Sequence, residues 1–453
     1  MKNKGLILLA GVVVALSLYA YFGEYKREVH EHHKKEVENK IITLKKDQVQ
    51  NIEIQKGAGA LISLKRTIDG WDMEKPAQDQ ADNEVVESFL DQITSEQATD
   101  RIKPQSTDLK EYGLKPSLGT VTLVDNTGKK QEIEISSKKN FEGLVYLKVD
   151  HHPEVLTGSQ TWTTFLTKPI DQFRNLRLFR GSISKVNKIT LDNDKGTTEF
   201  EYADGFWFSP QKSNWKLDQN AVREILTQAS TAKGTSIIAD TRPYGPVGKH
   251  LLTLTFQMDK ETWKALLHQD SKSKDVIAAI SPTHLIIRFP PQTLEELQSK
   301  NVLDFRNKTE PFQFDSSNVK RIVAHSKIKS FSLVMTNGHW EQETPDPNAI
   351  VSLNMADDLV KKLNRMTVYH YLEHPPHQME MNNDIQLFNA DHELIFQFSW
   401  SDFKDHEAYA KTNRSGEVFQ IDDAQVNQLM LPEIVKLKPP KISTDKSQKE
   451  EKK

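Results

Sequence analysis

The chain has 453 residues, with 60 Lys and Arg against 63 Asp and Glu and a formal net charge of −3. This balance argues against a nucleic-acid partner, whose binding needs a clustered excess of basic side chains. The absence of cysteine excludes thiol catalysis, cysteine zinc sites, disulfides and a cysteine-linked lipid anchor. The length is that of roughly three domains, enough to bury cores without covalent or metal support.

Residues 5–22 form an uncharged apolar segment. As a helix it spans roughly 27 Å, enough to cross the hydrocarbon core of a bilayer. Lys2 and Lys4 precede it, and its far end carries aromatic side chains that favour a membrane interface: Tyr19, Tyr21 and Phe22. We predict a single transmembrane anchor in the lipid bilayer at residues 5–22, after a cytoplasmic tail at residues 1–4.

A cleaved signal peptide is the alternative to this anchor. Cleavage requires small residues one and three positions before the cut, and Leu18-Tyr19-Ala20 matches that pattern poorly. The basic residues that follow the segment would, by a literal count, place the body in the cytoplasm. We nevertheless expect a single-pass protein of the inner (cytoplasmic) membrane with a periplasmic or extracytoplasmic body, because a short N-terminal tail usually stays inside.

Residues 23–40 follow as a predicted charged, helical stalk. Residues 24–40 contain no Gly or Pro, and Glu31 and Lys35 have the i,i+4 spacing of a helical ion pair. His30 and His33 would share one helical face, with His32 beside them. Metal binding is an alternative interpretation, but no third ligand is evident, so a solvated stalk is favoured.

A Gly closely followed by Trp and then by Pro recurs three times in the body, at Gly70-Trp71 with Pro76, Gly205-Phe206-Trp207 with Pro210, and Gly338-His339-Trp340 with Pro345. A β-rich segment precedes each Trp at a near-constant spacing, beginning at Val49, Val186 and Val319. A helical pattern follows each Trp at a constant spacing, beginning at Asp82, Asp218 and Val351. The body is therefore expected to contain one module three times.

We predict an α+β fold of three related modules, each a mostly antiparallel sheet packed with one main helix. The expected boundaries are 41–183, 184–316 and 317–438. A disordered charged tail is expected at 439–453, because that segment has almost no apolar residues to bury.

Within each module the patterns are those of capped helices and hairpins. Asp82 and Asp218 stand where helix N-caps are expected. Turns are predicted at residues 126–128 and 389–391, each between alternating strands. Residues 262–274 are charged where the other modules have a tight hairpin, and we interpret them as an inserted loop. Each Trp is expected to anchor the core or edge of its sheet, with ligand stacking as the alternative.

No constellation of residues that performs chemistry emerges from the sequence. Residues 245–249 end like a phosphate-binding loop but lack its spacing and its Ser or Thr, so a plain loop is expected. His374 and His377 flank two prolines, and His151-His152-Pro153 suggests a turn; metal ligation at the first pair is the alternative. The paired carboxylates Asp357-Asp358 and Asp422-Asp423 are expected on helix surfaces or turns. We therefore assign no catalytic, cofactor-binding or metal residue, and predict that the protein is not an enzyme.

The sequence resembles the bacterial DUF4340 family. The features that match are the N-terminal span, the charged stalk, the Gly-Trp-Pro element, the helix start at Ala81-Asp82, and the loop at residues 111–116, Glu-Tyr-Gly-Leu-Lys-Pro. The resemblance is best over residues 1–185. It implies no catalytic residue, but it implies a membrane-tethered envelope protein and a partnership with an ABC-type transporter.

The expected function is thus that of an envelope scaffold or accessory protein for an ABC-type transporter or a similar membrane complex. Two alternatives stay open. One is an extracytoplasmic module that binds a glycan, lipid or peptide in a cleft between modules. The other is a novel or degenerate hydrolase, which would need His and carboxylate side chains brought together only by the fold.

Overall fold

The structure is a computed structural model. It describes residues 12–14, 17–19, 21–22, 39–105, 108–150, 152–239, 248–326, 330–344, 353–376 and 378–429. Residue contacts divide the chain into two compact units: residues 1–180 with 233–240 and 285–289, and residues 181–232 with 241–284 and 290–453.

The predicted anchor and stalk lie mostly outside the described residues. Within the anchor, residues 12–14, 17–19 and 21–22 are helical, and of the stalk only residues 39 and 40 are described. In the part of the chain that the structure describes, no helix is long and apolar enough to cross a membrane. The predicted tail at 439–453 also falls outside the described residues.

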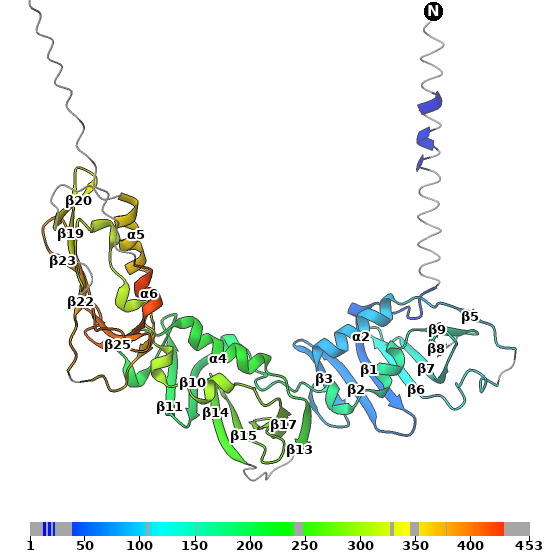
Figure 1. Cartoon of the computed structure of the whole chain (residues 1–453). Helices are drawn as coiled ribbons and strands as arrows, with labels where there is room; N and C mark the ends of the chain where they lie inside the picture. Colours follow the sequence, from blue (N-terminus) through cyan, green and yellow to red (C-terminus); the bar gives the residue numbers. More distant parts are fainter. Residues whose placement is uncertain are drawn as a thin grey trace, which may run out of the picture. The chain divides into compact units, whose positions relative to one another are not determined.

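The first sheet has nine antiparallel strands in the order β4-β3-β2-β1-β6-β7-β8-β9-β5. They are β1 (Val49–Lys56), β2 (Leu61–Thr67), β3 (Gly70–Lys75), β4 (Asp79–Gln80), β5 (Arg101–Ile102), β6 (Gly119–Asp125), β7 (Lys130–Lys139), β8 (Val145–Val149) and β9 (Val155–Gly158). Alternate side chains such as Ile52 and Ile54 are buried, as a strand with one covered face requires. Figure 1 shows α2 (Asn83–Ser95) beside the strands of this sheet, and residues of both α2 and α3 (Thr161–Thr167) belong to its core.

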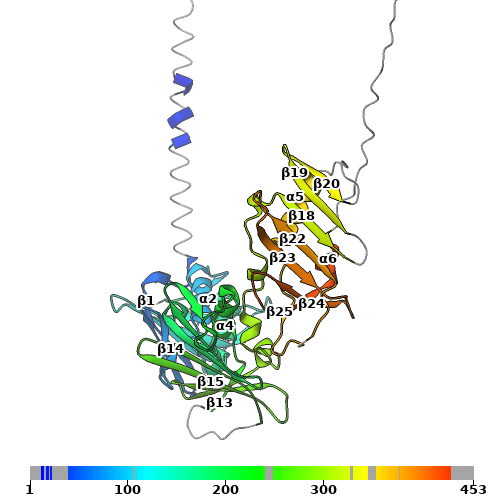
Figure 2. The ribbon, with the colours of Figure 1, turned by 90° about the vertical axis from the view of Figure 1, so that its left-hand side faces the viewer.

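The second and third sheets have eight strands each, in the orders β12-β11-β10-β14-β15-β16-β17-β13 and β20-β19-β18-β22-β23-β24-β25-β21. The second sheet contains β10 (Val186–Asn193), β11 (Gly196–Ala203), β12 (Phe206–Phe208), β13 (Ser236–Ala239), β14 (Lys249–Met258), β15 (Glu261–Gln269), β16 (Val276–Ser281) and β17 (Leu285–Phe289). The third contains β18 (Arg321–His325), β19 (Phe331–Thr336), β20 (His339–Thr344), β21 (His370–Tyr371), β22 (Asn383–Phe388), β23 (Leu394–Trp400), β24 (Glu407–Thr412) and β25 (Val418–Asp422). Figure 2 shows strands of the third sheet side by side.

The remaining helices accompany these sheets. The α-helices are α4 (Gln219–Thr231), α5 (Leu353–Leu363) and α6 (Asp423–Asn427). Short 3-10 helices lie between elements: η1 (Lys46–Gln48), η2 (Ile170–Phe173), η3 (Ile183–Lys185), η4 (Pro210–Lys212), η5 (Glu295–Gln298), η6 (Val302–Phe305), η7 (Glu310–Phe312) and η8 (Ser316–Asn318). Apart from the extra strand β4, the three sheets repeat one strand order, and in each a main helix follows the first hairpin strands along the chain.

The predicted caps and turns are present. The carboxylate of Asp82 accepts hydrogen bonds from the backbone N–H groups of Glu84 and Val85, and Asp218 does the same at the start of α4. The turn between β6 and β7 is closed by Asp125, whose carboxylate accepts from the N–H groups of Thr127 and Lys129. Local side-chain bonds of this kind depend only on neighbouring residues, and so they are legible in the sequence.

The interpretation of residues 262–274 as an inserted loop is wrong for residues 262–269, and residues 270–274 form the turn that follows them. Strand β15 occupies Glu261–Gln269 and pairs with both β14 and β16. Trp263, Ala265 and Leu267 alternate toward the core, whereas Thr262 and Lys264 are exposed. The period of two was present in the sequence, but the charged residues on the outer face concealed it.

Candidate functional site

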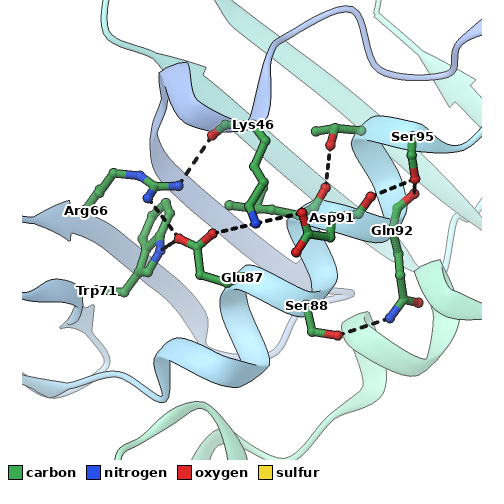
Figure 3. Close-up of polar contacts among 10 residues, drawn as sticks. Lys46, Arg66, Trp71, Glu87, Ser88, Asp91, Gln92 and Ser95 are labelled. Atoms are coloured by element: carbon green, nitrogen blue, oxygen red, sulfur yellow. Dashed lines mark hydrogen bonds and ion pairs between the residues drawn. The ribbon is translucent and has the colours of Figure 1, made fainter.

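The indole of Trp71 connects strand β3 to helix α2. Its ring is buried, and its Nε1–H donates a hydrogen bond of 2.7 Å to Oε1 of Glu87 (Figure 3). Its backbone N–H donates to Oδ1 of Asn83, the first residue of the helix. Gly70 allows this approach, because a Cβ at that position would lie 2.1 Å from the Asn83 side chain. The Gly-Trp element therefore fixes the helix against the sheet.

Two cations complete the environment of Glu87. Arg66 reaches Oε1 at 2.8 Å and Lys46 reaches Oε2 at 3.0 Å, while Lys46 also contacts Asp91 at 2.6 Å (Figure 3). The guanidinium of Arg66 lies 4.5 Å from the centre of the Trp71 ring, in cation–π geometry. The cluster thus joins η1, β2, β3 and α2 through one carboxylate.

These contacts change the acidity of the groups involved. Burial by itself raises the pKa of Glu87, but hydrogen bonds from Trp71 and Lys46 and the charge of Arg66 outweigh it, so the pKa lies below its ordinary value. The hydrogen bond to Asp91 is the largest influence on Lys46, and it raises the pKa of the ammonium. Both pKa shifts favour the charged forms of Glu87 and Lys46, as expected for a structural ion-pair network.

The other flank of α2 forms a groove with α3. The groove has a volume of about 550 Å³ and is lined by Glu84, Val85, Ser88, Phe89, Gln92, Gln160, Thr161, Thr164, Phe165, Lys168 and Lys233. Phe89 and Phe165 stack face to face and are almost fully buried. The Oγ1 of Thr161 donates to Oε1 of Gln92 at 3.0 Å, so the two helices are bridged across the groove.

Lys233 at the margin of the groove is held by Asp82, the capping carboxylate of α2, at 2.5 Å. The groove therefore presents hydroxyl, amide and ammonium groups above an aromatic floor. Such a mixture suits the binding of a segment that carries both apolar and hydrogen-bonding groups. This groove is our candidate site, and the Glu87 cluster keeps the helix that forms it in place.

The structure places the residues singled out from the sequence as follows. Trp71 and Trp340 are 1% exposed and Trp207 is 4% exposed, so all three belong to the cores and cannot stack on a ligand. Asp357 accepts a hydrogen bond from Nε1 of Trp340 at 3.1 Å, and Asp422 caps α6. Both carboxylates thus have structural roles.

Of the histidines singled out from the sequence, the structure describes His152 and His374. His30, His32, His33, His151 and His377 lie outside the described residues. Over the described ranges, no group of three or more His, Cys, Asp or Glu side chains could hold a metal ion. Of the loop at 245–249, only Gly248 and Lys249 are described, and Lys249 begins β14.

The loop at residues 111–116 packs beside β7. Gly113 has φ of +70°, its N–H donates to the Lys110 carbonyl, and its own carbonyl accepts from Ser137. Leu114 is buried with Leu109 and Val155 in a small separate cluster. The Gly and Leu of this loop therefore serve the fold, with Gly supplying a conformation that other residues rarely adopt.

Sequence reasoning missed the Glu87 cluster and the groove. A signal for part of the cluster exists, because the carboxylates of Glu87 and Asp357 follow Trp71 and Trp340 at nearly the same spacing. The second module breaks that pattern, since Arg223 stands at the equivalent position after Trp207. The groove depends on α3, and its lining residues lie on segments too far apart in the chain to be associated by spacing.

Comparisons with known proteins give one result. The model of the family described as Domain of unknown function (DUF4340) matches residues 24–116 and 71–247. No curated protein and no solved structure gives a significant match.

Proposed function

Because the chain carries a DUF4340 domain, whose family description assigns no function, we propose a role from its architecture. It is a membrane-tethered envelope scaffold or accessory protein without catalytic activity of its own. Its partner is an ABC-type transporter or a similar membrane complex. The single observation that carries this proposal is the repetition of one strand order in three sheets, because repeated modules offer repeated surfaces to a partner.

The tether and its side belong to the same proposal. The apolar residues 5–22 form a single-pass anchor in the inner (cytoplasmic) membrane, and three related modules stand outside the cytoplasm. Fusions at the C-terminus test the side: alkaline phosphatase should be active and green fluorescent protein dark. The reverse pattern would place the body in the cytoplasm and remove the envelope role.

The groove between α2 and α3 is the surface that we assign to the partner. A photo-crosslinking amino acid at Thr164, which is exposed in the groove, should give adducts with transporter subunits in native membranes. The same amino acid at Ile68, fully exposed on the β2–β3 turn, is the matched control and should not. Mass spectrometry identifies the adducts. Recovery of the protein alone from both positions, at native abundance, would count against a scaffold.

A second candidate function is the extracytoplasmic binding of a glycan, lipid or peptide. The groove favours it, because a volume of about 550 Å³ with an aromatic floor matches a small ligand as well as a protein segment. Thermal shift measurements with fractionated envelope extracts discriminate between the two. A stabilising fraction that contains no protein points to this second function, and a flat response in all fractions removes it.

A further inference from the structure

A second pocket lies at the start of the described body, where residues 39–43 cross one end of the first sheet. It has a volume of about 690 Å³. The buried side chain of Gln131 fixes this segment: its Oε1 accepts from the Thr43 N–H at 3.0 Å, and its Nε2 donates to the Ile41 carbonyl at 3.2 Å. The Ala98 N–H also donates to the Asn39 carbonyl at 2.8 Å. The wall of the pocket is therefore built by specific contacts.

The lining of this pocket is basic. Its cationic side chains are Lys40, Arg101, Lys129 and Lys130, against one acid, Asp150. Arg101 is paired with Glu154 at 3.4 Å and Lys130 with Glu132 at 3.1 Å, and neither of those acids lines the pocket.

The remaining two cations, Lys40 and Lys129, form no ion pair with any residue that the structure describes. Asp125 is close enough for its pKa to respond to the charge of Lys129, but its Oδ1 already accepts three hydrogen bonds within the turn. Among the described residues, two ammonium groups at the pocket thus have no ion-pair partner, and Asp150 is the one carboxylate in the lining. In water such groups attract anions, and a concave site concentrates that attraction.

His152 supplies a second, independent observation. It lines the same pocket, and its Nδ1 atom is buried without a hydrogen-bond partner among the described residues. The carboxylate oxygen Oε2 of Glu154 is 4.0 Å away, beyond hydrogen-bond distance. A buried polar atom without a partner costs free energy, which a ligand oxygen or a bridging water can recover.

We propose that this pocket binds a phosphate group. Two ammonium groups match a phosphate group, which offers several anionic acceptor oxygens in both mono- and diesters, and lysine is a common phosphate-binding residue. The phosphate belongs either to an anionic lipid headgroup or to a soluble phosphorylated molecule. A lipid headgroup is one of the two sources because only residues 23–38 separate the end of the predicted anchor, Phe22, from Asn39.

The test uses the full chain in nanodiscs and removes the charges of Lys40 and Lys129. Binding of inorganic pyrophosphate is measured by calorimetry in neutral phosphatidylcholine nanodiscs. In the second arm, binding of short-chain phosphatidylglycerol is measured under the same conditions. The double variant Lys40→Gln/Lys129→Gln should weaken the binding about tenfold, since two charge-assisted contacts are lost. The matched control, Lys56→Gln/Lys185→Gln, removes two exposed lysines elsewhere and should leave the affinity unchanged.

The outcomes separate the two sources. Pyrophosphate binding that is lost in the double variant supports the pocket with a soluble ligand. Phosphatidylglycerol binding that is lost in the double variant supports it with a lipid headgroup. Absence of binding in both arms, or binding that the double variant and the control weaken equally, overturns the proposal. Circular dichroism of both variants shows that the fold is retained, because all four lysines are exposed.

Discussion

Asp79 and Trp215 occupy equivalent positions, shortly before the helix caps Asp82 and Asp218, and each contacts a buried arginine. Arg174 forms an ion pair of 2.6 Å with Asp79, whereas the guanidinium of Arg306 lies 4.6 Å from the centre of the Trp215 ring.

The backbone around these two contacts is the same. Each arginine follows a phenylalanine whose carbonyl accepts from the N–H of the helix cap at 2.8 Å: Phe173 for Asp82 and Phe305 for Asp218. At the same backbone position, the first module thus contacts its buried arginine with the carboxylate of Asp79, and the second module with the aromatic ring of Trp215. Both solutions offset the cost of burying a guanidinium.

Replacement of Asp79 by Asn should be strongly destabilising. Asp79 faces Arg174 and Arg180, each at 2.6 Å, and the side chains of these two arginines are only 8% and 4% exposed. Loss of one partner from such a buried network typically costs about 3–5 kcal/mol. Urea unfolding of the full chain measures the change. Asp72→Asn, at an exposed position, should stay within about 0.5 kcal/mol of the wild type. Equal midpoints for the two variants would contradict the role of Asp79.

Replacement of Trp215 by Ala should loosen the second unit around Arg306. That guanidinium also lies 4.2 Å from the Tyr371 ring and pairs with Glu417, so part of its environment persists. We expect a loss of about 0.5–2 kcal/mol, the usual range for a cation–π contact. Hydrogen exchange at the Val368 amide, which bonds to the Lys308 carbonyl, reports the loosening.

Trp215→Phe is the control for this change, because it keeps an aromatic face over the guanidinium. It should exchange at a rate close to the wild type. If the Phe and Ala variants exchange equally fast, the ring contact contributes nothing and the prediction fails.

Glu87 should make the first module sensitive to acid. Its pKa in the folded chain lies below the ordinary value of 4.5, because of the contacts with Trp71, Lys46 and Arg66. The unfolded chain therefore binds the proton first as the pH falls. The stabilisation is complete above pH 4.5 and is lost as the pH falls through the lower, folded value.

The variant Glu87→Gln tests this dependence. It keeps an acceptor for the Trp71 indole but removes the charge, so it should cost about 1–2 kcal/mol at neutral pH and lose part of the slope in acid. Urea unfolding between pH 3 and 7 measures both effects. Glu74→Gln, a control that breaks an exposed pair with Lys65, should retain the wild-type slope. An unchanged slope in Glu87→Gln would refute the prediction.

Gly113 in the loop at 111–116 should tolerate Ala less well than Gly128 does. Both have positive φ, +70° and +84°, which costs an L-residue about 1–2 kcal/mol. A Cβ on Gly113 would also lie 2.9 Å from the backbone nitrogen of Lys138, whereas a Cβ on Gly128 meets nothing within 4 Å. Thermal unfolding should thus show a larger loss for Gly113→Ala. Equal losses would show that the loop moves away from β7 without cost.

Local chemistry explains what could be anticipated about the fold. The caps Asp82 and Asp218 bond to backbone groups of their own first helical turn, and the turn at 126–128 is closed by its neighbour Asp125. The apolar stripe of α2, Val86, Phe89, Leu90 and Ile93, is buried as its spacing requires. In contrast, the very short strands β5 and β21 escaped notice, because such segments have no period of their own.

The candidate sites could not be anticipated in the same way. Thr161 and Gln92, which bridge the α2–α3 groove, are 69 residues apart, and Gln131 and Thr43 at the basic pocket are 88 residues apart. No spacing rule connects residues at such separations, and only the closing of the sheet brings them within hydrogen-bond distance.

The sequence by itself determined the repeated Gly-Trp elements, the capped helices and the presence of a DUF4340 domain, because these depend on near neighbours and on periodic burial. Tertiary structure decided the rest. It made β15 a strand, assigned each Trp to a core, and assembled the α2–α3 groove and the basic pocket at residues 39–43. The reason is physical. Side chains of opposite charge or complementary shape interact only at short distance, and the folded backbone sets which residues come close enough for contact.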